Sequence, residues 1–300
     1  MTELTPNHTA KVVAEIGCNH KGEMAIAKEM IEIAAKTCKA DFVKFQKRNN
    51  RELLPPEQYD APHPNPVNSY GDTYGAHREF LEFDTDQHKE LMDHCAEQGI
   101  GYSTSVWDVT SAREMAQLEP EFLKVPSASN LHWPMLTVLC EEFKGQIQLS
   151  LGMTTKEEED QIVEFFEDKG RAEDLLLYAC TSGYPVNFDE LCLLEITRLK
   201  DKFDGRVGGI GFSGHHLGIA ADIAALTLGA EWIERHFTLD RTWKGTDHSA
   251  SLEPDGLRRL CRDVKAVSRS LTCKQGDLTP VEEAMRDKLK WTGGGDQPAA

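Results

Sequence analysis

The chain contains 300 residues, of which 40% are hydrophobic and 28% charged, the composition of a globular protein with a large core. Its formal net charge of −17 argues against a binder of nucleic acid or of anionic membranes, since such proteins present a basic face. The N-terminus lacks an apolar signal-peptide core, and no apolar run reaches the roughly 20 residues of a membrane helix. The cysteines lack paired spacing. We therefore expect a cytoplasmic protein whose cysteines are reduced.

Strand-like and helix-like segments alternate along the chain. Apolar runs predict strands at residues 11–17, 40–46, 100–105, 122–128, 146–152, 175–182, 207–212 and 232–237. Helical spacing of apolar residues predicts helices at residues 23–38, 84–99, 108–117, 133–143, 155–168, 189–203, 217–228 and 255–271. These repeats predict a (β/α)₈ TIM barrel, which typically needs ~250 residues. The competing open doubly wound sheet is less favoured, because "EIGCNHKG" lacks the spacing of a dinucleotide-binding glycine motif.

Two regions fall outside this alternation. The stretch from Asn49 to about Phe83 is rich in Pro, Asn and Gly and too long for an ordinary connection, so we expect a functional lid or binding loop. The C-terminal residues 291–300 are expected to be disordered. Residues 1–290 are expected to form a single barrel domain.

Polar side chains end all eight predicted strands, where the active sites of such barrels lie. Lys44 and Lys124 stand inside apolar strands, and because burying an unpaired ammonium group is costly, each needs an anionic partner. That partner is either a structural carboxylate or the phosphate or carboxylate of a ligand held at the barrel mouth. Further donors to such an anion would be the hydroxyl groups of Thr104, Ser127, Ser150 and Ser213.

Two histidines, His215 and His236, end neighbouring predicted strands. Each alone could be a packed or capping residue, but together they suit a catalytic divalent metal with open positions for substrate, such as Mn²⁺, Mg²⁺, Fe²⁺ or Co²⁺. Glu15 could complete the metal site or act as a general base. Since adjacent side chains on a strand point in opposite directions, we expect His216 to pack or cap the next helix instead.

Several motifs together are similar to those of the sialic acid (N-acetylneuraminate) synthase family. They are "AEIGCNHKG", "FVKFQ", "YGDTYG", "GFSGHH", "ERHFT" and "TWKGTDHSASLEP", in the same order from about residue 12 to residue 290. The resemblance implies a (β/α)₈ barrel and a homodimer. It also implies a transferase that condenses phosphoenolpyruvate with an N-acylated hexosamine, such as N-acetylmannosamine, to give a nine-carbon 2-keto acid and phosphate.

The resemblance also implies roles for individual residues. His215 and His236 would hold a divalent metal (Mn²⁺ or Mg²⁺, with Co²⁺ as a further candidate) that polarises the sugar aldehyde. Glu15 would activate or orient the water that adds to the substrate. Phosphoenolpyruvate would be bound by Lys44, Thr104, Lys124, Ser127, Ser150 and Ser213. The sugar would be contacted by Gln46, Asn68, Ser182, Tyr184 and Asp247.

The sequence departs from the family pattern at several positions. Ser129 stands where many members carry glutamate, Ser182 where some carry asparagine, and Leu151 where threonine is frequent. The sequence also ends before the antifreeze-like C-terminal domain of many bacterial members, whose arginine reaches the partner's sugar site. We therefore expect intact phosphoenolpyruvate chemistry. The sugar substrate could be an N-acetylated hexosamine, another acylated amino sugar or a non-acetylated hexose.

Two other functions remain as alternatives. A Schiff-base aldolase or lyase could use Lys44 or Lys124 as its nucleophile. A non-catalytic barrel could bind sugar or phosphoenolpyruvate without turnover.

Overall fold

Residues 8–291 are described by the structure, which is a computed structural model. Eight parallel strands in this part of the chain are β1 (Lys11–Gly17), β2 (Phe42–Lys47), β3 (Gly101–Val106), β4 (Phe122–Val125), β5 (Gln146–Ser150), β6 (Leu175–Cys180), β7 (Gly209–Gly214) and β8 (Trp232–His236). They hydrogen-bond in sequence order, and β8 pairs with β1 to close a barrel. The predicted (β/α)₈ TIM barrel is confirmed, and the open sheet is excluded.

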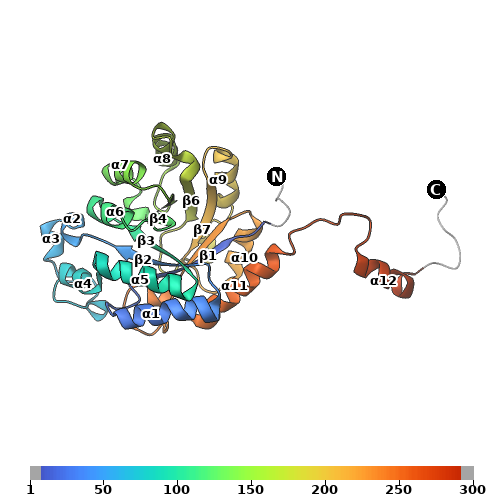
Figure 1. Cartoon of the computed structure of the whole chain (residues 1–300), viewed down its shortest axis with the longest axis horizontal. Helices are drawn as coiled ribbons and strands as arrows, with labels where there is room; N and C mark the ends of the chain where they lie inside the picture. The colour runs from blue at the N-terminus through green and yellow to red at the C-terminus, as the bar shows by residue number, and fades with distance from the viewer. Residues whose placement is uncertain (1–7, 292–300) are drawn as a thin grey trace.

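Helices surround the outside of this barrel (Figure 1). The main helices are α1 (Met24–Glu32), α5 (Thr85–Gln98), α6 (Val109–Ala116), α7 (Trp133–Glu142), α8 (Lys156–Asp168), α9 (Glu195–Phe203), α10 (Ala220–Thr227) and α11 (Pro254–Ser268). Shorter helical turns are η1 (Ile33–Cys38), η2 (Pro66–Asn68), η3 (Ser127–Ser129), η4 (Ala172–Asp174), η5 (Phe188–Glu190) and η6 (His248–Ala250). The predicted helices are present, although α9 begins later than predicted because the chain turns at Cys192, whose φ is 49°.

Local sequence explains where several helices begin and end. The Asp84 carboxylate accepts a hydrogen bond from the backbone of Gln87, and the Gln87 side chain accepts one from the backbone of Asp84. This reciprocal capping fixes the start of α5, and Gly99 ends the helix with a φ of 71°, which favours glycine. Thr155 and Glu158 cap α8 in the same way.

The apolar core lies in two places. Between strands and helices, buried apolar residues form two clusters, one that includes residues of β4 to β7 and one that includes residues of β1, β2 and β8. Inside the barrel, the aromatic rings of Phe42, Phe122 and Trp232 pack with centroids 5.2–5.3 Å apart. These three residues begin their strands, so they close the amino-terminal end of the barrel. Polar side chains are left for the opposite, carboxyl end.

The stretch from residue 49 to residue 83, predicted to be a lid or binding loop, contains three short α-helices joined by irregular segments. It contains α2 (Asn50–Leu53), α3 (Pro56–Tyr59) and α4 (Tyr74–Leu81). The hydroxyl of Thr73 caps α4 by accepting a hydrogen bond from the backbone of Ala76. This segment lies beside the carboxyl ends of the strands, because four of its residues line the cavity described below: Tyr70, His77, Arg78 and Leu81.

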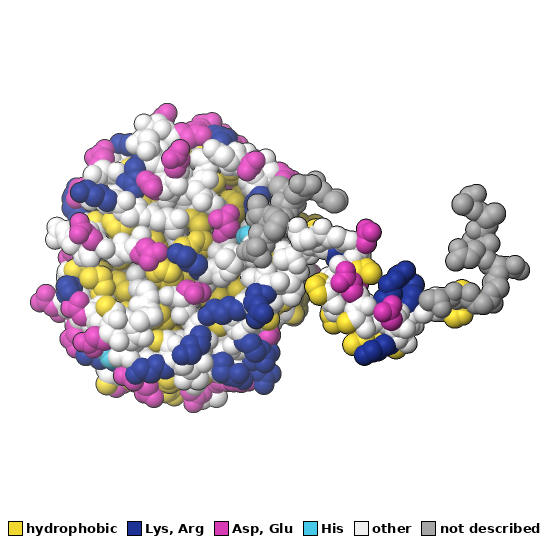
Figure 2. Space-filling model, turned by 45° about the vertical axis from the view of Figure 1, so that its right-hand side comes forward, with side chains coloured by type: hydrophobic (Ala, Val, Ile, Leu, Met, Phe, Trp, Pro, Cys, Tyr) yellow, Lys and Arg dark blue, Asp and Glu magenta, His cyan; other side chains and the backbone are white. Residues whose placement is uncertain are grey.

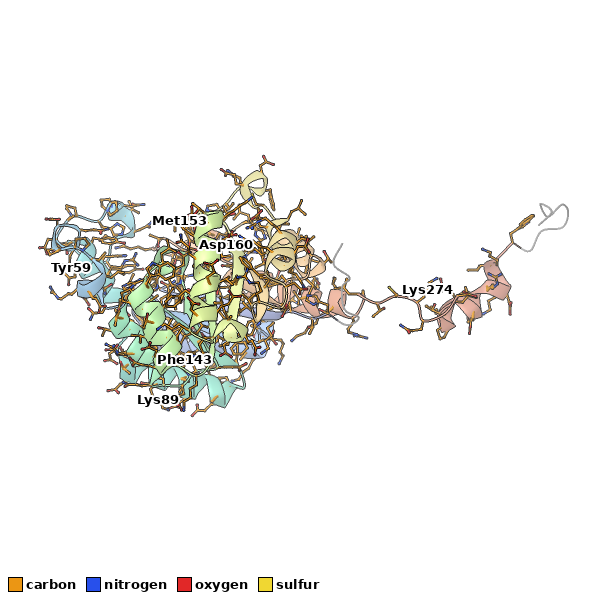
Figure 3. All side chains as sticks on the ribbon, turned by 90° about the horizontal axis from the view of Figure 1, so that it is seen from above. Tyr59, Lys89, Phe143, Met153, Asp160 and Lys274 are labelled. Atoms are coloured by element: carbon orange, nitrogen blue, oxygen red, sulfur yellow. The ribbon has the colours of Figure 1, made fainter. Side chains whose placement is uncertain are left out.

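The last helix, α12 (Pro280–Leu289), stands apart from the barrel (Figures 1 and 2). It follows a segment without helix or strand that carries Lys274 clear of the barrel (Figure 3). Its apolar residues Val281, Met285 and Leu289 are exposed.

Assignment of residues 1–290 to one domain stays a prediction. Of the predicted disordered tail, residues 292–300 lie outside the described residues. Among residues 8–291, no helix has the length and apolar character needed to cross a membrane.

Candidate active site

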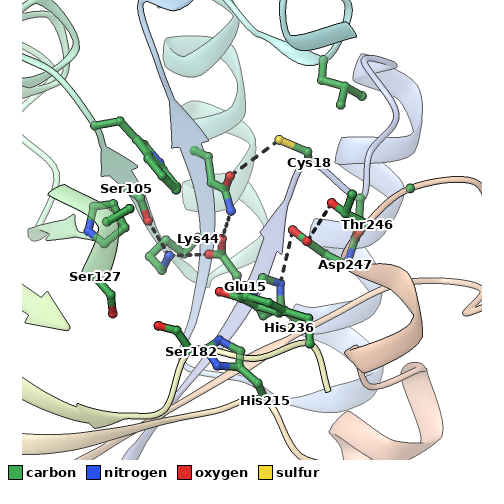
Figure 4. Close-up of a pocket in the computed structure, with 18 of the residues that line it drawn as sticks. Glu15, Cys18, Lys44, Ser105, Ser127, Ser182, His215, His236, Thr246 and Asp247 are labelled. Carbon is green, nitrogen blue, oxygen red and sulfur yellow. Dashed lines mark hydrogen bonds and ion pairs between the residues drawn. The ribbon is translucent and has the colours of Figure 1, made fainter. Parts of the chain in front are cut away.

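A cavity of about 410 Å³ opens at the carboxyl ends of the strands. Its lining includes the predicted site residues Glu15, Lys44, Gln46, Lys124, Ser127, Ser150, Ser182, Tyr184, Ser213, His215, His236 and Asp247. Figure 4 shows Glu15, Lys44 and His236 in the middle of this site, with Ser127, Ser182 and His215 on one side and Cys18, Thr246 and Asp247 on the other. The structure therefore brings together residues from all parts of the chain.

Thr104 was predicted to bind phosphate, but its side chain does not line this cavity. It is buried in β3 on the same side as Tyr102, which packs in the outer apolar layer. The next residue, Ser105, lines the cavity and accepts a 2.6 Å hydrogen bond from Nζ of Lys44. Because side chains alternate across a strand, the prediction chose the wrong one of two adjacent hydroxyl groups.

Asn68, a predicted sugar contact, also does not line the cavity. It ends η2, and Tyr70 from the same segment occupies the cavity wall instead. The Tyr70 ring stacks on Phe80 with centroids 5.0 Å apart, and its hydroxyl donates a 2.5 Å hydrogen bond to the carbonyl oxygen of Lys244. These contacts fix which residue of the segment faces the cavity, and they depend on a distant loop that local sequence does not reveal.

The two buried lysines are paired with two carboxylates. Nζ of Lys44 lies 2.5 Å from Oε2 of Glu15 and 3.6 Å from Oε2 of Glu234. Nζ of Lys124 lies 2.9 Å from the same Glu234 oxygen. Glu15 also accepts a 2.7 Å hydrogen bond from Gln46. Both lysines thus have structural ion pairs and also line the cavity, so the two interpretations of these lysines are compatible.

Glu234 was not among the predicted site residues. It lies two residues before His236 on β8, so the alternation of side chains along the strand could have placed both on the cavity face. Its Oε1 atom accepts a 3.0 Å hydrogen bond from the hydroxyl of Ser213. The hydroxyl group predicted to bind phosphate therefore also fixes this carboxylate.

The two carboxylates differ in their affinity for protons. Burial raises the pKa of Glu15, although the neighbouring Lys44 opposes that shift. Burial also acts on Glu234, but Lys124 and Lys44 together outweigh it and hold the pKa of Glu234 well below its usual range. Glu234 therefore stays ionised near neutral pH, and Glu15 is the better proton acceptor of the two.

The two predicted metal ligands face each other across the ends of β7 and β8. The rings of His215 and His236 have centroids 5.4 Å apart. Nδ1 of His215 donates a 2.9 Å hydrogen bond to the carbonyl oxygen of Thr181, which leaves Nε2 as the ring nitrogen for a metal, with the Cys180 side chain also close to this ring. Nδ1 of His236 is buried without a hydrogen-bond partner, and the nearest Asp247 carboxylate oxygen is 3.9 Å away. An unpartnered buried imidazole nitrogen fits a metal ligand.

Within the described part of the chain, no cluster of three or more His, Cys, Asp or Glu side chains forms a complete metal site. Metal binding by His215 and His236 therefore stays a prediction. His216, in contrast, is fully buried away from the cavity, with Nε2 3.1 Å from the guanidinium of Arg235 and 3.4 Å from Asp222. The prediction that His216 packs apart from His215 is confirmed.

Hydroxyl groups form the wall next to His215. The backbone N–H of Gly152 donates a 3.0 Å hydrogen bond to Oγ of Ser127. A Cβ atom on Gly152 would collide with the hydroxyl groups of both Ser127 and Ser182. Glycine at this position therefore allows two hydroxyl groups and a backbone N–H to converge, an arrangement that suits an anion.

Sequence reasoning also missed a group of cations in the outer part of the cavity, Arg48, Arg78 and Lys244. Arg48 could have been found, because it follows Lys44 and Gln46 at the same two-residue spacing. Arg78 and Lys244 come from segments whose course depends on tertiary contacts.

Residues 30–276 of the chain match the NeuB family. The chain belongs to this family. The N-acetylneuraminate-9-phosphate synthase of Homo sapiens is 38% identical over 287 residues, which are 94% of this chain and 77% of that protein. The N,N'-diacetyllegionaminic acid synthase of Campylobacter jejuni is 34% identical over 261 residues, 87% of this chain and 77% of that protein.

A solved structure agrees with this NeuB assignment. The N-acetylneuraminic acid (sialic acid) synthetase of Leptospira borgpetersenii, crystallised in complex with citrate, has a TM-score of 0.78 and 27% identity, and the match covers 94% of this chain and 93% of that chain. The resemblance seen in the sequence is confirmed, and with it the class of enzyme, a transferase that forms a carbon–carbon bond.

Proposed function

We propose that this NeuB-family chain condenses phosphoenolpyruvate with the open-chain aldehyde of an N-acylhexosamine, giving a nonulosonic acid and phosphate. One observation carries the proposal. The His215–His236 pair and the Lys44–Glu15–Glu234–Lys124 cluster line a single cavity at the carboxyl ends of the strands. Such a cavity offers cations for an anionic substrate beside a place where an aldehyde oxygen could be polarised.

His215 and His236 would hold the metal, with Mn²⁺ or Mg²⁺ as the first candidates and Co²⁺ as another. The unpartnered Nδ1 of His236 supports this assignment, as does the hydrogen bond that fixes the tautomer of His215. When bound, the metal would supply Lewis-acid polarisation of the sugar aldehyde. Tyr184, whose ring centroid lies 4.4 Å from that of His215, would pack against the sugar near this point, with Gln46, Ser182 and Asp247 as further contacts.

Phosphoenolpyruvate would bind on the lysine side of the cavity. Its phosphate and carboxylate would accept hydrogen bonds from Lys44 and Lys124, which are oriented by Glu15 and Glu234 before substrate arrives. Further donors would be the hydroxyl groups of Ser105, Ser127, Ser150 and Ser213.

The reaction then follows from these positions. The C3 carbon of phosphoenolpyruvate attacks the aldehyde carbon, which makes the new carbon–carbon bond, turns the aldehyde oxygen into an alkoxide that takes up a proton from solvent, and leaves cationic character at C2. Water adds to C2 and gives a proton to Glu15, whose pKa is raised by burial. The tetrahedral intermediate loses phosphate by cleavage of its C–O bond, and the 2-keto acid remains.

The Schiff-base alternative receives less support. A nucleophilic lysine must lose its proton, whereas against the effect of burial Glu15 and Glu234 raise the pKa of Lys44. Burial lowers the pKa of Lys124, but its Nζ is ion-paired with Glu234 at 2.9 Å, which opposes the loss of its proton.

The test measures phosphate release from phosphoenolpyruvate with Mn²⁺ and a panel of mannose, N-acetylmannosamine, its 6-phosphate and diacetamido sugars. We expect release with at least one N-acylated sugar and its loss with a chelator or in His236→Ala, because the metal would lose one of two ligands. A lysine adduct trapped by borohydride without metal dependence would overturn the proposal. Release in His236→Ala equal to that of the parent would overturn the metal assignment.

We also propose that the enzyme is a cytoplasmic homodimer. Eight free cysteines among the described residues support a reducing compartment. Light scattering of the purified protein would test the dimer.

A further inference from the structure

The cavity carries an excess of positive charge in a strongly acidic chain. Its cationic residues are Lys44, Arg48, Arg78, Lys124 and Lys244, and its carboxylates are Glu15, Glu234 and Asp247. The formal net charge of the whole chain is −17. Lys44 and Lys124 are ion-paired with Glu15 and Glu234, whereas within residues 8–291 none of the other three cations forms an ion pair with a carboxylate. We call Arg48, Arg78 and Lys244 the outer cation cluster.

Arg48 is the most buried member of this cluster, with 4% of its surface exposed. Its guanidinium lies over the Trp107 ring, 4.0 Å from the centroid. Its Nη2 donates to the amide oxygen of Gln46, Nη1 lies 3.7 Å from Sγ of Cys18, and Nε is buried with no hydrogen-bond partner. A buried guanidinium with neutral partners and an unused N–H is unfavourable unless an anion completes the site.

Arg78 comes from α4 and is also without a carboxylate partner among the described residues. Its Nε and Nη2 donate hydrogen bonds of 3.1 and 2.6 Å to the hydroxyl of Tyr74. Lys244, in the loop after β8, holds its ammonium 4.7 Å from the centroid of the Tyr70 ring. Aromatic groups thus orient all three cations, and among the described residues no carboxylate lies within ion-pair distance of them.

The cluster lies on the side of the cavity opposite the phosphoenolpyruvate site proposed above. Cys18, which Arg48 contacts, lies beside Asp247 and across Glu15 and Lys44 from Ser127 and Ser182 (Figure 4). Two separate groups of cations could therefore bind two separate anions.

We propose that the outer cation cluster binds a phosphate group on the end of the sugar remote from its aldehyde, so that the second substrate is a phosphorylated N-acylhexosamine. This inference rests on the proposed function. A neutral sugar would leave the buried guanidinium of Arg48 without an ion-pair partner, whereas a phosphate dianion can accept paired hydrogen bonds from arginine. The relatives named above differ on this point, because one is named for a 9-phosphate product and the other for an acid without phosphate in its name.

The test compares kcat/KM for N-acetylmannosamine 6-phosphate and N-acetylmannosamine in the parent, Arg78→Gln and Lys244→Gln. Charge-assisted hydrogen bonds of this kind contribute enough for a loss of at least about tenfold each. We expect the parent to prefer the phosphorylated sugar and each variant to reduce that preference at least tenfold, mainly through the KM of the phosphorylated sugar. Arg269→Gln, which removes one exposed arginine from α11's C-terminal end, is the matched control and should keep the parent's preference.

Equal losses for both sugars, or a parent that prefers the unphosphorylated sugar, would overturn the inference. If neither sugar releases phosphate from phosphoenolpyruvate, the proposed reaction fails, and calorimetry of the two sugars then tests the cluster alone. Binding of N-acetylmannosamine 6-phosphate that is weakened at least tenfold in Arg78→Gln would support the cluster. Equal binding of the 6-phosphate by parent and variant would overturn it.

Discussion

Glu234 lies between the two buried lysines of the cavity. Its Oε2 atom is 2.9 Å from Nζ of Lys124 and 3.6 Å from Nζ of Lys44. A buried ammonium group needs a counter-charge, and Glu234 supplies one to both lysines, although burial still lowers the pKa of Lys124. An arriving anion therefore meets side chains that this carboxylate has already oriented, and it has to share them with it.

Lys124→Met is the sharpest test of this arrangement at the level of one residue. Methionine keeps the length of the side chain and its packing over Tyr178, whose ring centroid is 3.7 Å from Nζ, but it removes the charge. Loss of a charge-assisted hydrogen bond to phosphoenolpyruvate should raise its KM about 10- to 100-fold and change the KM of the sugar much less. Steady-state kinetics with each substrate varied in turn would measure this.

The control for this variant is Lys169→Met, which removes a partly exposed lysine paired with Glu141 on the outer helices. It should leave both KM values close to those of the parent. An equal rise of both KM values in Lys124→Met would contradict an anion-binding role for Lys124.

Strand β3 shows how a single strand decides which hydroxyl group can act. Ser105 accepts the 2.6 Å hydrogen bond from Lys44, whereas Thr104 lies on the opposite face and donates only a long 3.4 Å hydrogen bond to the carbonyl oxygen of Ser105. Ser105→Ala should therefore raise the KM of phosphoenolpyruvate by roughly 5- to 20-fold, because Lys44 loses the neutral partner that orients it.

Thr104→Val is the matched variant for this element. Valine keeps the size of the side chain and removes one hydroxyl group from the same strand. We expect less than about a threefold change in the KM of phosphoenolpyruvate, with a modest loss of stability. Kinetics of both variants at saturating sugar decide the matter. A larger effect in Thr104→Val than in Ser105→Ala would restore Thr104 as a ligand.

The strand ends could be predicted from sequence because alternating strands and helices fix the fold, and the fold fixes where the carboxyl ends meet. His215, His236 and Lys44 were found in this way. The pairing of Lys124 with Glu234 could not be predicted, because it depends on how β4 and β8 project into the closed barrel. The position of Arg78 in the cavity could not be predicted for a related reason. It depends on the short helices between residues 49 and 83, whose aromatic contacts orient the Arg78 side chain.

Two of the buried histidines, His20 and His88, couple the stability of the whole molecule to pH. The His20 ring stacks on Phe83, the last residue of the 49–83 segment, with centroids 4.1 Å apart. Both histidines also pack near the Phe45 ring. Burial lowers the pKa of His20 to about 3 and, with a contribution from Lys47, that of His88 to about 3.

Both histidines are therefore neutral in the folded state at pH values where the unfolded chain takes up protons. An unfolded histidine has a pKa of about 6.5, so their contribution to stability is complete above that pH and falls as the pH drops toward 3. In the lower part of this pH window, each histidine should lower the free energy of unfolding by roughly 1.4 kcal/mol for every unit by which the pH falls. The carboxylates add their own effect below about pH 5.

Urea unfolding of the parent and of His88→Gln between pH 7 and pH 4.5 would separate this contribution. Glutamine does not titrate, and its amide can still meet the hydroxyl of Tyr102, which lies 2.6 Å from Nδ1 of His88. We expect the variant to be less stable at pH 7, because it loses ring packing. On acidification its free energy of unfolding should fall less steeply than that of the parent, because its unfolding takes up close to one proton fewer. Parallel pH profiles for parent and variant would show that His88 does not contribute to the acid sensitivity of the barrel.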